Sequence, residues 1–122
     1  MKRLPNLIIT SGDPAGIGLD LCVILAFKKF LANITIIGNK DAILARARQM
    51  KKNIKVSTKL GSHLGNGELK IINLDYKNPV VAGQLDKNNS LQQLKGLKTS
   101  IELCLTKKFD ALITLPIHKK IL

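Results

Sequence analysis

The segment Thr10–Gly18 has the sequence TSGDPAGIG, and this glycine-rich stretch decides how the chain is expected to fold. The apolar run before it, residues 7–9, is typical of a buried strand, and Leu19–Leu31 after it is apolar enough for a buried helix. We therefore predict a tight turn that joins a strand to a helix, with Pro14 fixing the backbone near the helix start. Asp13, directly before the proline, is expected to supply the N-cap carboxylate.

The glycines of this turn predict a close approach of the backbone to another group. Gly12, Gly16 and Gly18 tolerate positive φ angles and leave room that a side chain would fill. A helix N-terminus offers N–H groups and partial positive charge, so the turn could hold an anionic ligand. The alternative is a turn that merely connects two buried elements, and glycine spacing alone does not separate these two interpretations.

Blocks of sequence along nearly the whole chain resemble the 4-hydroxythreonine-4-phosphate dehydrogenase family, the PdxA-type enzymes. The blocks are TSGDPAGIG, Ile36-Ile37-Gly38, Gly83-Gln84-Leu85-Asp86 with the helix expected after it, Phe109–Thr114, and a T-x-P-x-x-K loop that includes Pro116-Ile117-His118-Lys119. The resemblance implies a three-layer α/β fold, a mostly parallel sheet with flanking helices, like that of isocitrate and isopropylmalate dehydrogenases. The family is more than twice as long, so residues 1–122 are expected to be its truncated N-terminal segment, without a complete second domain.

The resemblance also implies an activity. It is the NAD- or NADP-dependent oxidation and decarboxylation of 4-phosphohydroxy-L-threonine in pyridoxal phosphate biosynthesis, with a divalent metal (Zn, Mg, Mn or Co), in a cytoplasmic homodimer. The family's metal-binding histidines follow the T-x-P-x-x-K loop, so this chain is expected to contain no metal ligand and no catalytic residue, and to be inactive alone. The residues that would bind the nucleotide stay undefined.

Two positions depart from the family pattern and leave the substrate open. Leu115 stands where the family has a small residue before the proline, and Leu19-Asp20 replaces Pro-Glu after the glycine turn. One alternative is therefore a relative that acts on another phosphorylated hydroxy acid. Another is a non-catalytic remnant that binds anions or a partner.

The candidate site lies at the carboxyl ends of two predicted strands, where ligands bind in open α/β sheets. If the strand before the glycine turn neighbours the strand at 111–114, the loops after both strands converge on one cleft. The residues that would line a substrate or anion site there are Gly12, Asp13, Gly16, Gly18, Thr114, His118 and Lys119. Lys119 could neutralise a phosphate or carboxylate and His118 could donate a hydrogen bond to it, although both could equally be ordinary loop residues.

The remaining pattern predicts βαβ units and a mostly parallel sheet. The expected strands are residues 4–10, 34–37, 54–56, 69–74 and a buried strand at 111–114, and the expected helices are 19–31, 41–52 and 91–107. In the second helix, Arg46 is expected to face water. In the third helix, Ser90 is expected to be the N-cap, and an apolar stripe is expected to cover the sheet: Leu91, Leu94, Ile101, Cys104 and Leu105. His63, in a glycine-containing loop, is expected to be exposed.

Composition limits the choice of partners. The formal net charge is +12, from 20 basic and 8 acidic residues, which favours anionic ligands. Aromatic residues are 3% of the chain, too few to stack bases, so no specific nucleic-acid partner is expected. Cys22 and Cys104 form no metal or disulfide pattern, which fits a reducing cytoplasm. No signal peptide or membrane span is expected.

Overall fold

The computed structural model describes residues 3–12, 15–75 and 86–116, with the side chain of Ser90 left out. Within these ranges, five strands form one sheet in the order β3-β4-β2-β1-β5, and every neighbouring pair is parallel. The strands are β1 (Asn6–Thr10), β2 (Asn33–Gly38), β3 (Lys55–Ser57), β4 (Glu68–Asn73) and β5 (Ala111–Thr114); the helices are α1 (Gly18–Leu25), α2 (Lys40–Gln49) and α3 (Lys87–Leu105). The predicted parallel sheet is confirmed.

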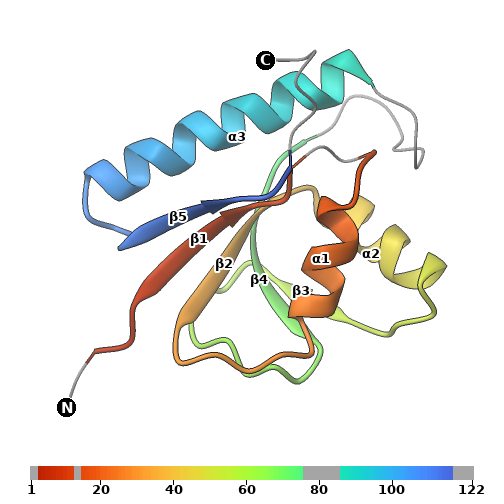
Figure 1. Cartoon of the computed structure of the whole chain (residues 1–122), viewed down its shortest axis with the longest axis horizontal. Helices are drawn as coiled ribbons and strands as arrows, with labels where there is room; N and C mark the ends of the chain where they lie inside the picture. Colours follow the sequence, from red (N-terminus) through yellow and green to blue (C-terminus); the bar gives the residue numbers. More distant parts are fainter. Residues whose placement is uncertain (1–2, 13–14, 76–85, 117–122) are drawn as a thin grey trace.

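Helices on both faces of the sheet give the three predicted layers: α1 and α2 lie on one face and α3 on the other (Figure 1). Alternate residues of a strand point to opposite faces. In β2, Ile34 and Ile36 accordingly join the large core beneath α1 and α2, whereas Ile37 joins a smaller core beneath α3. The larger core also takes Leu19 from α1, which is fully buried.

The strand order places the carboxyl ends of β1 and β5 side by side. In the register of β1, Thr10 stands opposite Ile37 of β2 on one side and Thr114 of β5 on the other. The condition on which the candidate site depended, that these two strands are neighbours, is therefore met. The loop that leaves each strand begins at the same edge of the sheet.

Helix α1 is shorter than predicted, because it ends at Leu25 and does not continue to residue 31. The connection between β3 and β4 binds carbonyl groups at and just after the end of the helix. The Nε2 atom of His63 lies 3.0 Å from the carbonyl oxygen of Leu25 and 2.7 Å from that of Lys28, and the amide of Gly67 donates to Ala26. The expectation that His63 is exposed is wrong, since only 4% of its surface is accessible.

Helix α3 differs from the prediction at its start and in the face that it buries. Its N-cap is Asp86, whose side chain accepts a hydrogen bond from the amide of Asn89 at 3.1 Å, and not Ser90. The predicted apolar stripe does not cover the sheet as a unit: Leu91, Ile101 and Leu105 are exposed, while Leu94 and Cys104 are half-buried. Fully or almost fully buried on this helix are the polar residues Asn89, Gln93 and Ser100.

The strand β5 is also less buried than predicted, because it forms one edge of the described sheet. Ala111, Ile113 and Thr114 are exposed.

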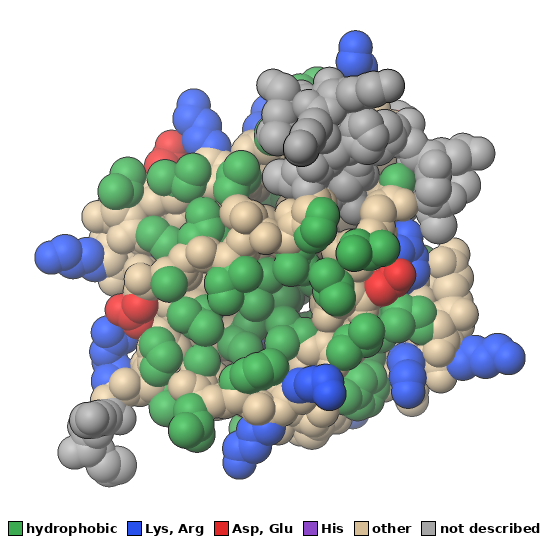
Figure 2. Space-filling model, in the orientation of Figure 1, with side chains coloured by type: hydrophobic (Ala, Val, Ile, Leu, Met, Phe, Trp, Pro, Cys, Tyr) green, Lys and Arg blue, Asp and Glu red, His purple; other side chains and the backbone are tan. Residues whose placement is uncertain are grey.

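Figure 2 shows apolar side chains gathered over β1, β5 and α1 on one face of the molecule. Three exposed apolar residues at or within α1 are Ile17, Leu21 and Ile24.

None of the helices in the described part of the chain is both long enough and apolar enough to cross a bilayer. The described cysteines, Cys22 and Cys104, are not joined to one another and are free thiols.

The end of the sheet opposite the candidate site is tied by Asp110, which gives a prediction on pH. One oxygen of this carboxylate accepts from the backbone amide of Asn6 at 2.7 Å, and the other accepts from Arg3 at 3.0 Å. These donors, the amide first, lower the pKa of Asp110 from its ordinary value of 3.8. The ionised carboxylate therefore stabilises the fold above that value, and its contribution is lost as the pH falls through the lowered pKa.

We expect Asp110→Asn to unfold at a lower urea concentration than the wild type at neutral pH, with the difference shrinking as the wild-type carboxyl group is protonated. Urea unfolding of both proteins from neutral pH into the acid range measures this. Arg3→Gln should have a smaller effect at neutral pH, because the amide of Asn6 still binds the carboxylate. A difference that stays constant with pH would contradict this assignment.

Candidate functional site

The loops that follow β1 and β5 are in direct contact. The amide of Leu115 donates to the carbonyl oxygen of Thr10 at 3.2 Å, which extends the pairing of β1 and β5 by one residue. Gly12 then has a φ of +76°, and a Cβ atom there would lie 2.4 Å from the carbonyl oxygen of Pro116. Only glycine fits this position, because both the conformation and the contact exclude a side chain.

The glycine turn (Ser11–Gly18) begins α1 by a second close approach. A Cβ atom on Gly18 would lie 1.8 Å from the carbonyl oxygen of Ser11, so strand and helix pass each other backbone to backbone. The N-cap of α1 is Ile17, without a side-chain hydrogen bond, whereas Asp13, the expected N-cap, lies outside the described residues. Both described close approaches are made by the chain itself, and they explain Gly12 and Gly18 without a ligand.

A buried arginine binds the second half of the glycine turn. Arg46 of α2 is only 7% exposed, and its Nη1 atom donates to the carbonyl oxygen of Gly16 at 3.0 Å and to Oδ1 of Asp20 at 2.7 Å. The prediction that Arg46 faces water is wrong, because the partners that hold it inward lie 26 and 30 residues earlier in the chain. Asp20 is the position where the sequence departs from the family's glutamate, and it still forms an ion pair.

Hydroxyl groups at the first half of the turn were missed by the sequence analysis. Ser11 and Thr10 are both fully buried. The Ser11 hydroxyl donates to Oε1 of Gln93 on α3 at 3.2 Å. The Thr10 hydroxyl has no hydrogen-bond partner among the described residues. Periodicity gives no sign of these contacts, because Ser11 and Gln93 are 82 residues apart.

Of the seven predicted site residues, four lie in the described part of the chain. Gly12 and Gly18 are buried, Gly16 is half-buried beside Arg46, and Thr114 is exposed at the end of β5. Asp13, His118 and Lys119 lie outside the described residues, so their convergence on the site stays a prediction. What the structure brings together is the backbone of the two loops, at Gly12 and Pro116.

The described residues do not fit a metal ion, because no group of three or more His, Cys, Asp or Glu side chains among them could hold one. Burial raises the pKa of the Cys22 thiol to about 12, so this buried group stays protonated near neutral pH and is no nucleophile.

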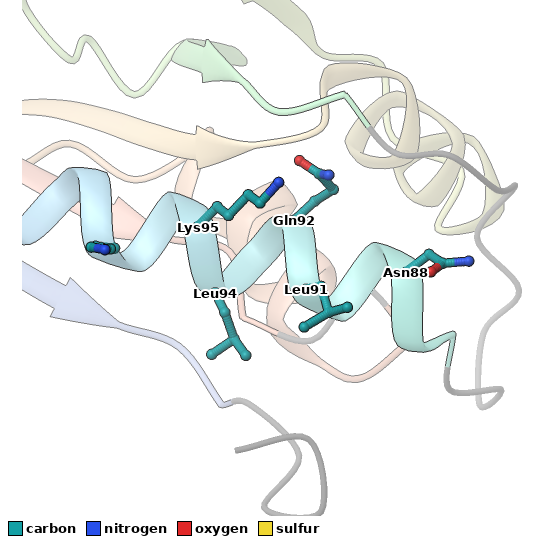
Figure 3. A pocket seen from close by; sticks show the side chains of 6 residues that line it. Asn88, Leu91, Gln92, Leu94 and Lys95 are labelled. Carbon is teal, nitrogen blue, oxygen red and sulfur yellow. The ribbon is translucent and has the colours of Figure 1, made fainter.

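A separate hollow lies along α3, away from the glycine turn. It has a volume of about 330 Å³ and is lined by Asn88, Leu91, Gln92, Leu94, Lys95 and Lys98. Figure 3 shows Leu91 and Leu94 projecting from one side of the helix, and Gln92 and Lys95 from the other. Among the predicted site residues that the structure describes, Gly12, Gly16, Gly18 and Thr114, none lines this pocket.

The comparisons with known proteins agree with the resemblance. A family model described as pyridoxal phosphate biosynthetic protein PdxA matches residues 30–122. The 4-hydroxythreonine-4-phosphate dehydrogenase of Methylococcus capsulatus is 32% identical and covers 97% of this chain. Its counterpart from Neisseria meningitidis serogroup B is 34% identical and covers 100% of the chain. In both cases the match covers 37% of the relative, so the chain spans less than two-fifths of these proteins.

Solved structures confirm the fold. The crystal structure of a 4-hydroxythreonine-4-phosphate dehydrogenase from Burkholderia phymatum matches 98% of this chain with a TM-score of 0.85 and 22% identity, over 38% of its own length. A terephthalate 1,2-cis-dihydrodiol dehydrogenase from Burkholderia xenovorans matches with a TM-score of 0.75 and 18% identity. At these identities the structural likeness establishes the architecture alone.

The close approach at Gly18 gives a prediction about stability. Gly18→Ala should destabilise the fold by about 1–3 kcal/mol or more, because the new methyl group meets a backbone carbonyl that cannot move freely. Gly61→Ala is the matched control, since a Cβ atom there has nothing within 4 Å, and it should change stability by less than about 0.5 kcal/mol. Urea unfolding compares the two, and equal effects would contradict the tight packing of the turn.

The contacts of Arg46 give a second prediction. Arg46→Met keeps the apolar stem but removes the donor, and we expect a loss of about 1–3 kcal/mol in the free energy of unfolding. Asp20 is 39% exposed in its side chain, so water moderates the loss of the ion pair. Arg48→Met, on the exposed side of the same helix, should change stability by less than about 0.5 kcal/mol. Thermal or urea unfolding that ranked the two variants in the reverse order would refute the assignment.

Proposed function

This chain belongs to the PdxA family of pyridoxal phosphate biosynthetic proteins. We therefore propose that it forms the part of a 4-hydroxythreonine-4-phosphate dehydrogenase that binds the phosphate group of the substrate. The proposed reaction of the whole enzyme is the oxidation of 4-phosphohydroxy-L-threonine by NAD or NADP, followed by loss of carbon dioxide. The proposal places the enzyme in the cytoplasm, as a homodimer.

The contact between the two loops supports this proposal most directly. Gly12 and Pro116 touch at the carboxyl ends of neighbouring parallel strands, which is where open α/β sheets bind ligands. The glycine turn also leads into the N-terminus of α1, an end that favours negative charge. A net charge of +12 adds a long-range attraction for a phosphorylated substrate.

In this proposal, residues of the two loops have separate tasks. The amides of the glycine turn, with Asp13 at its tip, would orient the substrate. Lys119 would neutralise the phosphate, and His118 would donate a hydrogen bond to it. A divalent metal, when bound, would polarise the oxygen atoms of the substrate. Since the described residues do not fit a metal, none of them is assigned to hold it.

Phosphate titration of the isotope-labelled chain, followed by the NMR signals of backbone amides, tests the proposed site. We expect the signals of Gly12, Gly16 and Gly18 to shift with inorganic phosphate, and Lys119→Gln to weaken binding about tenfold, the effect of losing one charge-assisted contact. Lys59→Gln, an exposed lysine in another loop, is the control and should leave the affinity unchanged.

The same protein should not form NADH from 4-phosphohydroxy-L-threonine when divalent metals are added, with a full-length relative as the positive control. Formation of NADH by the 122-residue chain would overturn the proposal that this chain binds the substrate without catalysing the reaction. Absence of phosphate binding at the glycine turn would overturn the proposed site.

A further inference from the structure

Ser11 is enclosed by two glycines from different elements. Its carbonyl oxygen would lie 1.8 Å from a Cβ atom on Gly18, at the start of α1. Its Oγ atom would lie 2.6 Å from a Cβ atom on Gly38, at the end of β2. This fully buried serine therefore occupies the space that side chains on Gly18 and Gly38 would fill.

The third contact of Ser11 comes from the opposite face of the sheet. Its hydroxyl donates to Oε1 of Gln93 at 3.2 Å, and both residues are 0% exposed. The Ser11 hydroxyl fills the space beside Gly38 that a side chain on that residue would occupy, and the hydrogen bond to Gln93 joins it to α3. The amide of Ser11 also donates to Ile37 at 3.2 Å, which ties the backbone to β2.

The position of Gln93 on α3 makes this contact informative. A leucine would fill a helix face packed against a sheet without the cost of burying an amide, yet here a glutamine is buried while leucines of the same helix are exposed. Ser100, one of the other buried polar residues of α3, binds within its own helix, since its hydroxyl donates to Gly96 at 2.8 Å. Gln93, in contrast, accepts a hydrogen bond from Ser11, the first residue of the glycine turn.

We propose that Gln93 is a positioning residue: it holds Ser11 and thereby orients Gly12 and the following amides toward the loop after β5. This inference rests on the proposed function of the turn as a phosphate-binding site. Without the hydrogen bond, the turn occupies its binding conformation for a smaller fraction of the time. The apparent phosphate affinity falls in proportion to the fraction of molecules in that conformation. We expect Gln93→Leu to bind inorganic phosphate about fivefold to tenfold more weakly.

A double-mutant cycle on the isotope-labelled chain tests whether Gln93 acts through Ser11. The variants are Gln93→Leu, Ser11→Ala and the pair, with phosphate affinity and the ligand-free amide signals of residues 11 and 12 as the two readouts. Each single variant should lower the affinity and shift those signals. The pair should lose no more affinity than one single variant, because both remove the same bond. Ser100→Ala is the matched control and should leave both readouts unchanged, even if it lowers the thermal midpoint.

The two readouts separate the failure of this inference from the failure of the proposed function. If the wild type does not bind phosphate, the proposed function fails. The ligand-free amide signals of residues 11 and 12 still test whether Gln93 positions the turn. If Gln93→Leu leaves the signals of residues 11 and 12 and the affinity unchanged, the inference is wrong. It is also wrong if the losses in the pair are additive. Should Gln93→Leu not fold, Ser11→Ala must lower the phosphate affinity for the inference to stand.

Discussion

The structure depends on the close passage of the backbone at Ser11 past the first residue of α1. The carbonyl oxygen of Ser11 occupies the space that a side chain on Gly18 would fill, and its hydroxyl occupies the corresponding space at Gly38. This packing fixes the angle at which the chain leaves β1, and with it the direction of α1 across the sheet. The same passage places Gly12 against Pro116, so the edge of the sheet and the candidate site have one geometric origin.

Much of the fold could be predicted, because short apolar runs separated by turns and helices are compatible with few arrangements other than a parallel sheet. The strand at 111–114 was predicted with the bounds that β5 has, and the neighbouring parallel strands followed from the βαβ pattern. The end of α1 was predicted too late in the chain, because apolar residues continue on both sides of Lys28 and Lys29, and the contacts near the end of the helix come from a distant loop. The predicted site residues stay a prediction. Arg46 and Gln93, which contact the turn, were not predicted, because their partners are far away in the sequence and leave no local signal.

The hydrophobic pattern of α3 predicted the wrong face of this helix as the one that packs on the sheet. Its apolar residues repeat at helical spacing, and such a stripe ordinarily packs on a sheet. Here three of its five members are exposed, and a glutamine, an asparagine and a serine are buried in their place. Periodicity identifies an amphipathic helix but not which of its surfaces meets the sheet, and buried polar contacts with a turn can decide the choice.

The bonds between His63 and the end of α1 have a consequence for biosynthesis. The carbonyl groups of Leu25 and Lys28, at and just after the end of α1, contact a side chain 38 and 35 residues later, and the C-cap Ala26 accepts from the amide of Gly67. As the ribosome extends the chain, the first β-α-β unit emerges before the residues that complete its helix. A nascent chain stalled before residue 67 therefore lacks some of the groups that bind the backbone at the end of its first helix.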